Sequence, residues 1–307
     1  MKVSFIATVF NEEKSILPLL RSVFSQTRLP DEIIIVDGGS TDKTISYISD
    51  FKSNKAKIKL VSKKGNRSVG RNEAIKRAAN EIIVCSDAGC ILDKNWVKNI
   101  TKPFEDQDIG VVSGYYRGMS RDIFQKCLIP YVLVMPDKVN ENNFLPASRS
   151  MAFRKSVWEK VGKFNEKLSH NEDYAFAIKL KEKGIKIVFE KLAIVSWIPR
   201  KNLKEAFIMF FRFAKGDVEA GVIRSNVIVL FARYFILLYL LFLIFRYKSL
   251  IIILSLAIGI SCYIIWAILK NYKYVIALKA IFVLPLIQTT ADIAVMLGSI
   301  TGIFEQL

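Results

Sequence analysis

The chain has 307 residues, of which 52% are hydrophobic, and it carries a formal net charge of +17. Its four cysteines lack the spacing of a zinc site or a disulfide framework, so we expect reduced, mostly buried thiols. From Asn226 onward there are six basic and two acidic residues among 82, which leaves 39 basic and 26 acidic residues before that point. A basic body with an apolar C-terminal region favours lipid surfaces and phosphorylated ligands. Because no nucleic-acid-binding motif is present, we expect no nucleic-acid partner.

Apolar, mostly β-branched runs alternate with helix-like stretches along the first part of the chain. Strands are predicted at residues 3–9, 32–36, 58–61 and 81–85, and helices at 13–25, 41–51 and 68–79. This order indicates an α/β fold with a parallel sheet and crossover helices. A mixed α/β region follows, with helices predicted at 95–104, 155–161 and 172–183 and strands at 109–114 and 185–189.

The second predicted strand ends in the most informative short segment of the chain. The apolar run 33–36 is followed by Asp37, by a turn at Gly38-Gly39, and by Ser40 or Thr41 as the predicted N-cap of the next helix. Ligands of open α/β sheets bind in the crevice outside the carboxyl ends of the strands. Asp37 is therefore placed where it can accept hydrogen bonds from a base or a ribose, although an ordinary turn acid is the alternative.

The C-terminal region contains three long apolar runs, at residues 226–245, 249–269 and 274–300. Arg233 is the only charged residue in the first run, and the second has none. A hydrocarbon core of about 30 Å needs about 20 apolar residues in a helix. We therefore predict a transmembrane region with about three helices at 226–307. Two crossings plus an interfacial helix is the alternative.

The segment before these runs is aromatic-rich and has basic edges. Residues 203–215 include four phenylalanines and are predicted to lie at the headgroup level of a bilayer, with a core helix as the alternative. The predicted domain plan is therefore an α/β domain at 1–200, an amphipathic interfacial segment at 201–225 and the transmembrane region at 226–307.

Five motifs occur in an informative order along the α/β domain. They are Thr8-Val9-Phe10-Asn11-Glu12, Val36-Asp37-Gly38-Gly39-Ser40-Thr41-Asp42, Val69-Gly70-Arg71-Asn72-Glu73-Ala74, Ser86-Asp87-Ala88-Gly89-Cys90 and Asn171-Glu172-Asp173-Tyr174. Together, over residues 3–200, they resemble the inverting, nucleotide-sugar-dependent glycosyltransferases of family 2. The resemblance implies the GT-A fold, which is a Rossmann-like nucleotide-sugar-binding domain. The ordered set is far more specific than any single motif.

The resemblance assigns roles to individual residues. It implies that Thr8, Asn11 and Glu12 line the nucleotide pocket, that Asp37 bonds the base, and that Arg71 contacts the base or the pyrophosphate. Asp87 matches the first acid of the family's Asp-x-Asp motif, near ribose and diphosphate. Donor binding is thus expected at Thr8, Asn11, Glu12, Asp37, Arg71 and Asp87.

The acid pair Glu172 and Asp173 is expected to carry the catalysis. Inverting transfer needs a carboxylate that takes the proton of the acceptor hydroxyl, and the resemblance gives this role to Asp173. The pair opens a predicted helix, whose positive end keeps carboxylates ionised. Adjacent residues do not share a helix face, so one can meet the acceptor while the other holds the loop. A simple pair of helix-start acids is the alternative.

Two positions depart from the family pattern at the expected metal site. Gly89 stands where the second acid of Asp-x-Asp is expected, and Trp197 stands where the family often has a metal-binding His. The leaving-group charge still needs neutralising. Either a divalent metal, Mg or Mn, is held through Asp87 and the donor phosphates, or arginines act as clamps. The arginines considered are Arg71, Arg149, Arg154 and Arg200.

These features predict a membrane enzyme of glycan or cell-envelope assembly. Only Arg212 matches the Gln-x-x-Arg-Trp motif of processive family members, which favours transfer of one sugar from a UDP- or GDP-sugar to a lipid-linked acceptor. The acceptor phosphates would meet Arg200, Lys201, Lys204 or Arg212. With no evident signal peptide in residues 1–14, we expect a multi-pass protein of the cell membrane with a cytoplasmic catalytic domain. The alternatives are a catalytically idle nucleotide-sugar-binding membrane subunit and a processive polysaccharide synthase.

Overall fold

The computed structural model describes residues 1–53, 56–168, 170–222 and 224–306. The predicted domain ranges also include the five remaining positions, 54, 55, 169, 223 and 307, which lie outside the described residues. The chain divides into two compact units. Unit 1 contains residues 1–119 and 133–198, and unit 2 contains residues 120–132 and 199–307. Residues 120–132, which we expected in the first domain, thus belong with the C-terminal region.

Unit 1 is built on one mixed sheet, in which the described residues form eight strands in the order β3-β2-β1-β4-β7-β6-β8-β5. The first four in this order run parallel, whereas β7 is antiparallel to both of its neighbours. The strands are β1 (Val3–Val9), β2 (Glu32–Asp37), β3 (Ile58–Ser62), β4 (Ile82–Cys85), β5 (Cys90–Leu92), β6 (Val111–Gly118), β7 (Met151–Arg154) and β8 (Ile187–Trp197).

Helices cover both faces of this sheet because its central strands are apolar on both sides. On one face, Ile6, Ile34 and Ile83 pack in a core with α3, α6 and α7. On the other, the ring of Phe5 meets that of Trp96 of α4 edge to face. The helices are α1 (Ile16–Phe24), α2 (Thr44–Ser49), α3 (Arg67–Arg77), α4 (Trp96–Thr101), α6 (Lys155–Lys160) and α7 (Glu172–Glu182).

The structure confirms the predicted βαβα order and corrects other parts of the prediction. Strand β8 extends to Trp197 instead of ending at 189, and the short strands β5 and β7 were not predicted. The prediction of Ser40 or Thr41 as N-cap is wrong, because α2 begins at Thr44. Both residues instead bond Asn11, whose backbone N–H donates to Ser40 Oγ and whose side-chain oxygen accepts from the Thr41 N–H.

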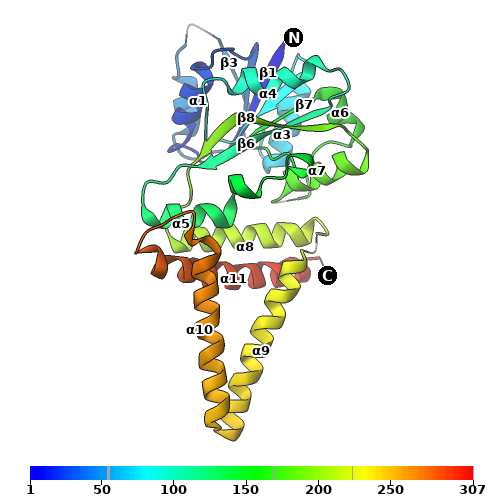
Figure 1. The fold of residues 1–307 in the computed structure, drawn as a ribbon. Helices are drawn as coiled ribbons and strands as arrows, with labels where there is room; N and C mark the ends of the chain where they lie inside the picture. Colours follow the sequence, from blue (N-terminus) through cyan, green and yellow to red (C-terminus); the bar gives the residue numbers. More distant parts are fainter. Residues whose placement is uncertain (54–55, 169, 223, 307) are drawn as a thin grey trace. The chain divides into compact units, whose positions relative to one another are not determined.

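Within its described residues, unit 2 contains five helices. They are α5 (Ile123–Val132), α8 (Leu203–Glu219), α9 (Ser225–Tyr247), α10 (Leu250–Tyr272) and α11 (Ala280–Phe304). Within the described residues, α9, α10 and α11 are long and apolar enough to cross a membrane. Helix α11 differs from the other two, because it lies alongside α8 and across the directions of α9 and α10 (Figure 1). If α8 and α11 both lie in the plane of a membrane, the protein has two crossings, as in the alternative above.

Small residues allow α8 and α11 to lie close together. A Cβ added at Gly298 would be 2.3 Å from the carbonyl oxygen of Phe211, and one at Gly302 would be 2.9 Å from Cβ of Val218. Helix α5 joins the pair through the hydroxyl of Tyr131, which donates to the carbonyl oxygen of Leu284 at 3.0 Å. The residues of 203–215 that we predicted at a headgroup layer therefore form one side of a helix pair.

A polar cluster connects α9, α10 and α11. Arg233 of α9 forms an ion pair with Asp292 of α11. The same carboxylate accepts from the hydroxyl of Tyr263 of α10 at 2.7 Å and from the side-chain amide of Gln288 at 2.8 Å. Ionisable groups inside a membrane region are costly unless they pair, so this cluster holds the three helices together.

Candidate active site

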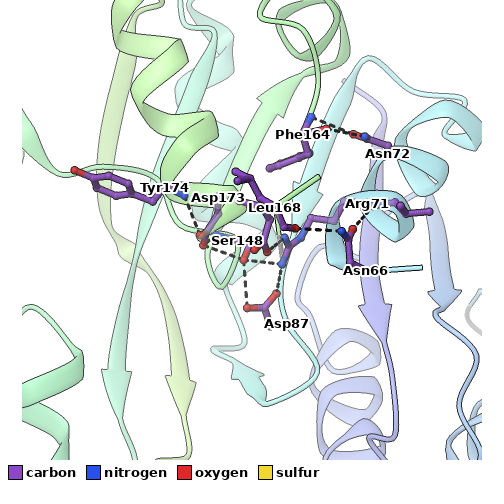
Figure 2. A network of polar contacts seen from close by, with 11 residues as sticks. Asn66, Arg71, Asn72, Asp87, Ser148, Phe164, Leu168, Asp173 and Tyr174 are labelled. Atoms are coloured by element: carbon purple, nitrogen blue, oxygen red, sulfur yellow. Dashed lines mark hydrogen bonds and ion pairs between the residues drawn. The ribbon is translucent and has the colours of Figure 1, made fainter. Parts of the chain in front are cut away.

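Arg71 lies at the centre of a polar network in unit 1 (Figure 2). Its side chain is only 1% exposed and forms an ion pair with Glu172. Its other terminal nitrogen donates to Asp87 at 3.0 Å and to the hydroxyl of Ser148 at 2.8 Å. The network therefore joins α3, the end of β4, the start of α7 and the loop before β7. Three residues predicted from separate motifs, Arg71, Asp87 and Glu172, meet at one place.

Ser148 brings the fourth predicted residue, Asp173, into the same network. Its backbone N–H and its hydroxyl lie 3.1 and 3.2 Å from one carboxylate oxygen of Asp173, and its hydroxyl lies 3.3 Å from Asp87. Ser148 is buried, while Asp87 and Asp173 keep part of their surface exposed. Sequence reasoning missed Ser148, because it belongs to none of the five motifs. Its position just before β7 would have been the only signal.

Residues 164–168, which precede α7 in the chain, are held by two asparagines of the α3 region. Asn66 caps α3 through Val69 and donates to the carbonyl oxygens of Glu166 and Leu168 at 2.7 and 3.1 Å. Asn72 exchanges two hydrogen bonds with the backbone of Phe164, at 2.9 and 3.1 Å (Figure 2). These bonds hold the segment before the acid pair against α3, which also carries Arg71. The positions of Arg71 and of the acid pair are thus set by one rigid element.

Adjacent acids at the start of α7 face different surroundings. Glu172 is 3% exposed and holds Arg71, whereas Asp173 is partly exposed and bonds Ser148. This is the division expected for neighbouring positions on a helix. Glu172 therefore supports the network from within, and Asp173 is the acid of the pair with the more exposed carboxylate.

The charges of the network stabilise one another. Burial opposes the charged form of Arg71, but the nearby carboxylates of Glu172 and Asp87 outweigh it and hold the pKa of Arg71 well above its ordinary value. Burial acts to raise the pKa of Asp87, yet Arg71, Arg67 and Arg149 together lower it below the ordinary value. Asp87 is therefore ionised at neutral pH.

The residues predicted at the ends of β1 and β2 form a neighbouring cluster. Asp37 is 1% exposed and accepts hydrogen bonds from the backbone N–H groups of Gly39 and Ser40, at 2.9 and 3.0 Å. It thereby shapes the turn that follows β2. Asn11, with φ of 54°, bonds that turn, and the backbone N–H of Glu12 donates to the Thr44 hydroxyl at 2.7 Å. The loop after β1 and the loop after β2 thus form one loop pair, which contains Asn11, Glu12 and Asp37.

Thr8 lies between this loop pair and the Arg71 network. A Cβ at Gly70 would be 2.8 Å from the methyl group of Thr8. Glycine therefore allows α3 to approach β1 closely, one residue before Arg71. Apart from Arg71, which belongs to α3, the predicted donor residues lie in or near the carboxyl ends of three adjacent parallel strands, β2, β1 and β4, where ligands of such sheets bind.

The residues around Asp87 do not match the donor set of a protein metal site. Among the described residues, no group of three or more His, Cys, Asp or Glu side chains is arranged to hold a metal ion. Gly89 has no side chain to offer, and the Trp197 indole is only a hydrogen-bond donor. Burial raises the pKa of the Cys85 and Cys90 thiols to about 12, so neither is a thiolate at neutral pH.

One predicted arginine clamp is wrong. Arg154 pairs with Ile82 at the start of β4, whereas Asp87 follows the end of that strand. Its guanidinium donates to the carbonyl oxygen of Ile109 at 2.9 Å and lies over the ring of Phe104. Arg154 therefore lies beside the amino-terminal end of β4, whereas Asp87 follows its carboxyl end. The antiparallel direction of β7, which was not predicted as a strand, is the reason.

Comparison with known proteins finds similar glycosyltransferases. The model of the family described as "Glycosyl transferase family 2" matches residues 4–162. The chain is 26% identical to the O-antigen chain rhamnosyltransferase RfbN of Salmonella typhimurium, over 69% of this chain and 71% of that protein. It is 27% identical to the poly-β-1,6-N-acetyl-D-glucosamine synthase of Staphylococcus epidermidis, over 71% of this chain but only 55% of the synthase.

Solved structures show the same fold. A mannosyltransferase from Pyrobaculum calidifontis in complex with GDP-Man and Mn2+ superimposes with a TM-score of 0.72 at 18% identity, covering 100% of this chain and 88% of that one. Staphylococcus aureus TarS 1-349 in complex with UDP-GlcNAc gives a TM-score of 0.54 at 20% identity, covering 74% and 69%. Unit 1 thus has the GT-A fold expected from its motifs.

Proposed function

Because this chain belongs to glycosyl transferase family 2, we propose that it moves a hexose from a UDP- or GDP-sugar to a lipid-linked acceptor with inversion, in glycan or cell-envelope assembly. One observation carries the proposal. Asp87 and Asp173, from motifs 86 residues apart, both reach the hydroxyl of Ser148, with the buried Arg71–Glu172 pair beside them. Two carboxylates are thus held side by side near the carboxyl ends of the parallel strands, where ligands of open α/β sheets bind.

In the proposed reaction, Asp173 is the general base. An acceptor hydroxyl oxygen forms a bond to the anomeric carbon, and its proton passes to the Asp173 carboxylate. The bond between that carbon and the donor's diphosphate oxygen breaks on the opposite face, and its electron pair stays on the diphosphate. Ser148 donates two hydrogen bonds to one oxygen of Asp173, which orients the carboxylate. Glu172 is a positioning residue, because it acts through Arg71.

The donor is proposed to lie along the ends of β2, β1 and β4. Thr8, Asn11, Glu12 and the turn held by Asp37 would border the nucleoside, and Asp87 would face the ribose and the diphosphate. Arg71 is too fully engaged with carboxylates to act as a free phosphate clamp, so its proposed role is to order Asp87 and the acid pair. The set of donor-binding residues is otherwise the one that the sequence resemblance implies.

A lipid-linked acceptor fits the character of unit 2. Arg200, Lys201, Lys204 and Arg212 lie in or just before α8 and are all exposed. They belong to the unit that carries the long apolar helices. Basic residues near a bilayer attract phosphate groups, so a polyprenyl phosphate or a lipid-linked glycan is the proposed acceptor. We propose that the protein is a multi-pass protein of the cell membrane with its catalytic domain in the cytoplasm.

A processive synthase is a second candidate, favoured by the similarity to the staphylococcal poly-N-acetylglucosamine synthases. Against it, only Arg212 of the Gln-x-x-Arg-Trp motif is present in α8. A divalent metal such as Mg or Mn is compatible with the family, and Asp87 with the donor phosphates would be its ligands. The donor set around Asp87 does not fit a protein metal site, so no step of the proposed reaction depends on one.

The test is transfer by purified protein in lipid nanodiscs. Nucleotide sugars, including GDP-mannose and UDP-N-acetylglucosamine, are screened with polyprenyl phosphate and with lipid-linked glycans as acceptors. We expect one donor to give a lipid product that carries a single added sugar. A ladder of longer products would favour the processive alternative. Nucleotide binding without transfer to any acceptor would favour a catalytically idle binding subunit.

A further inference from the structure

We propose that the guanidinium of Arg149, and not a divalent metal, neutralises the diphosphate of the donor in this chain. The proposal rests on the proposed function, because it concerns the same site. It assigns one of the arginines that the sequence left open. It also explains why both expected metal ligands are replaced.

The two replaced positions are neighbours in space. Strand β5 pairs antiparallel with β8, so Cys90 lies opposite Trp197. A Cβ at Gly89 would be 4.0 Å from Cδ1 of the Trp197 indole. Trp197 is 7% exposed, so its ring fills the space beside the Asp87 loop where a histidine would otherwise bring a ligand. Gly89, which replaces the expected second acid, and Trp197, which replaces the expected histidine, thus depart from the family pattern at one place in the structure.

Arg149 uses the indole as a platform. Its guanidinium carbon lies 5.2 Å from the ring centre of Trp197 and 5.7 Å from that of Tyr116. Tyr116 and Trp197 come from the paired strands β6 and β8, two residues apart in their register. A guanidinium that stacks on aromatic faces loses little freedom when it binds an anion. The side chain is therefore a cation held in a fixed place.

The backbone of Arg149 connects it directly to the network. Its carbonyl oxygen accepts from the hydroxyl of Ser86 at 2.8 Å, and its neighbour in sequence is Ser148. The charge of Arg149 contributes to the lowered pKa of Asp87. Among the described residues, Arg149 forms no ion pair, and its side chain is partly exposed. Its positive charge is thus available to a ligand beside Asp87.

The other arginines are less suited to this role. Arg71 is 1% exposed and is shared between Glu172 and Asp87, and Arg154 lies beside the amino-terminal end of β4. Arg149 is partly exposed, stacked and close to the loop of the first acid. A guanidinium binds phosphate oxygens through two parallel N–H bonds, which gives orientation as well as charge. As the diphosphate leaves with its electron pair, this contact stabilises the developing charge.

The test measures nucleoside diphosphate binding by calorimetry to the full protein in nanodiscs, with UDP, GDP, ADP and dTDP as probes. Each titration is made once in 5 mM Mg²⁺ and once in excess EDTA. The nucleotide concentration runs from about tenfold below to about tenfold above the Kd. For the diphosphate that binds, we expect Kd to differ less than threefold between the two conditions. Arg149→Ala should weaken binding by about 10- to 100-fold in both, as expected for a lost charge-assisted contact.

Arg149→Lys separates charge from geometry, and it should restore part of the affinity because lysine keeps the charge but not the planar fork. Arg77→Ala, an exposed arginine of α3 that pairs with Glu73, is the matched control and should leave Kd unchanged. Circular dichroism and the melting temperature of each variant check that the fold is intact.

Three results would overturn the inference. The first is binding that disappears in EDTA and returns with Mg²⁺, and the second is Arg149→Ala with wild-type affinity. Either would leave the proposed function standing, because the chain would still bind a nucleotide. The third is a wild-type protein that binds none of the four diphosphates under either condition, which would remove the proposed function together with the inference.

Discussion

Each unit of this protein contains an arginine paired with a carboxylate, but the two pairs differ in which partner is exposed. In unit 1, Arg71 is 1% exposed, while the Asp87 side chain beside it is 35% exposed. In unit 2 the order is reversed, because Asp292 is 7% exposed and Arg233 is 35% exposed. Asp292 is also bonded by Tyr263 and Gln288.

This difference separates a site from a structural clamp. A buried cation that holds partly exposed carboxylates can present those carboxylates to a ligand. A buried carboxylate surrounded by donors from three helices has its acceptor capacity used within the protein. Both clusters contain an arginine–carboxylate ion pair, so exposure of the acidic partner, and not the presence of an ion pair, is our criterion for proposing a site.

The largest loss of stability is expected from Arg71→Met. Removing this guanidinium leaves Glu172 buried without its partner, which costs about 3–5 kcal/mol of unfolding free energy in comparable pairs. Urea unfolding of the protein in detergent, followed by tryptophan fluorescence, measures the change. Glu172→Gln together with Arg71→Met should recover part of the loss, because the buried charge is then absent. If Arg71→Met alone were as stable as wild type, the Arg71–Glu172 pair would not be essential to the stability of unit 1.

Gly298→Ala tests the packing of α8 against α11. The added methyl group would meet the carbonyl oxygen of Phe211 at 2.3 Å, so the helices must move apart. Overpacking of this kind costs about 1–3 kcal/mol. Gly259→Ala in α10 is the matched control, because a Cβ there meets nothing within 4 Å. Equal melting temperatures for the two variants would contradict the close approach of α8 and α11.

Asp292→Asn tests the clamp in unit 2. The amide keeps a hydrogen-bonding oxygen but loses the ion pair with Arg233, which is partly exposed. Interactions between membrane helices contribute about 0.6 kcal/mol on average and up to about 1.7 kcal/mol, so we expect a loss in this range. The melting temperature in nanodiscs measures it. A loss as large as that of Arg71→Met would erase the distinction drawn between the two clusters.

Acid should reveal a smaller contribution from Asp87. Its pKa in the folded protein is lower than its ordinary value of 3.8, because the arginines around it outweigh burial. Its contribution to stability is therefore present above that ordinary value, which applies to the unfolded chain, and is lost as the pH falls through the lower folded value. Unfolding free energy measured between pH 6 and pH 3 should fall less steeply in Asp87→Asn. Identical slopes would contradict the pKa shift.

The sequence was sufficient for the parts of unit 1 that depend on local pattern. Strand β1 spans the predicted residues 3–9, and Arg71, Asp87 and the acid pair meet as their motifs implied. The hydroxyl of Ser148 was not predictable, because it acts only after the loop before β7 folds back. The wrong N-cap at Ser40 or Thr41 has the same origin, since Asn11, 29 residues earlier, competes for those groups.

Longer-range features were missed for related physical reasons. The platform for Arg149 depends on β8 reaching Trp197, eight residues beyond the predicted end, and on its pairing with β6. The hydrophobic pattern predicted where α11 lies in the sequence, but it did not predict the direction of the helix. An apolar run that packs along α8 and one that crosses a bilayer have similar compositions. Residues 120–132 belong to unit 2 because of tertiary contacts, which local sequence patterns do not predict.

The most direct test of the central claim compares Asp173→Asn with Asp292→Asn in single-turnover transfer, with nucleoside diphosphate affinity measured in parallel. Loss of a general base lowers the rate by about 10²–10⁴-fold. We expect this loss in Asp173→Asn with an unchanged Kd, and a wild-type rate per folded molecule in Asp292→Asn. Full turnover by Asp173→Asn would contradict the assignment of the base and of the site in unit 1.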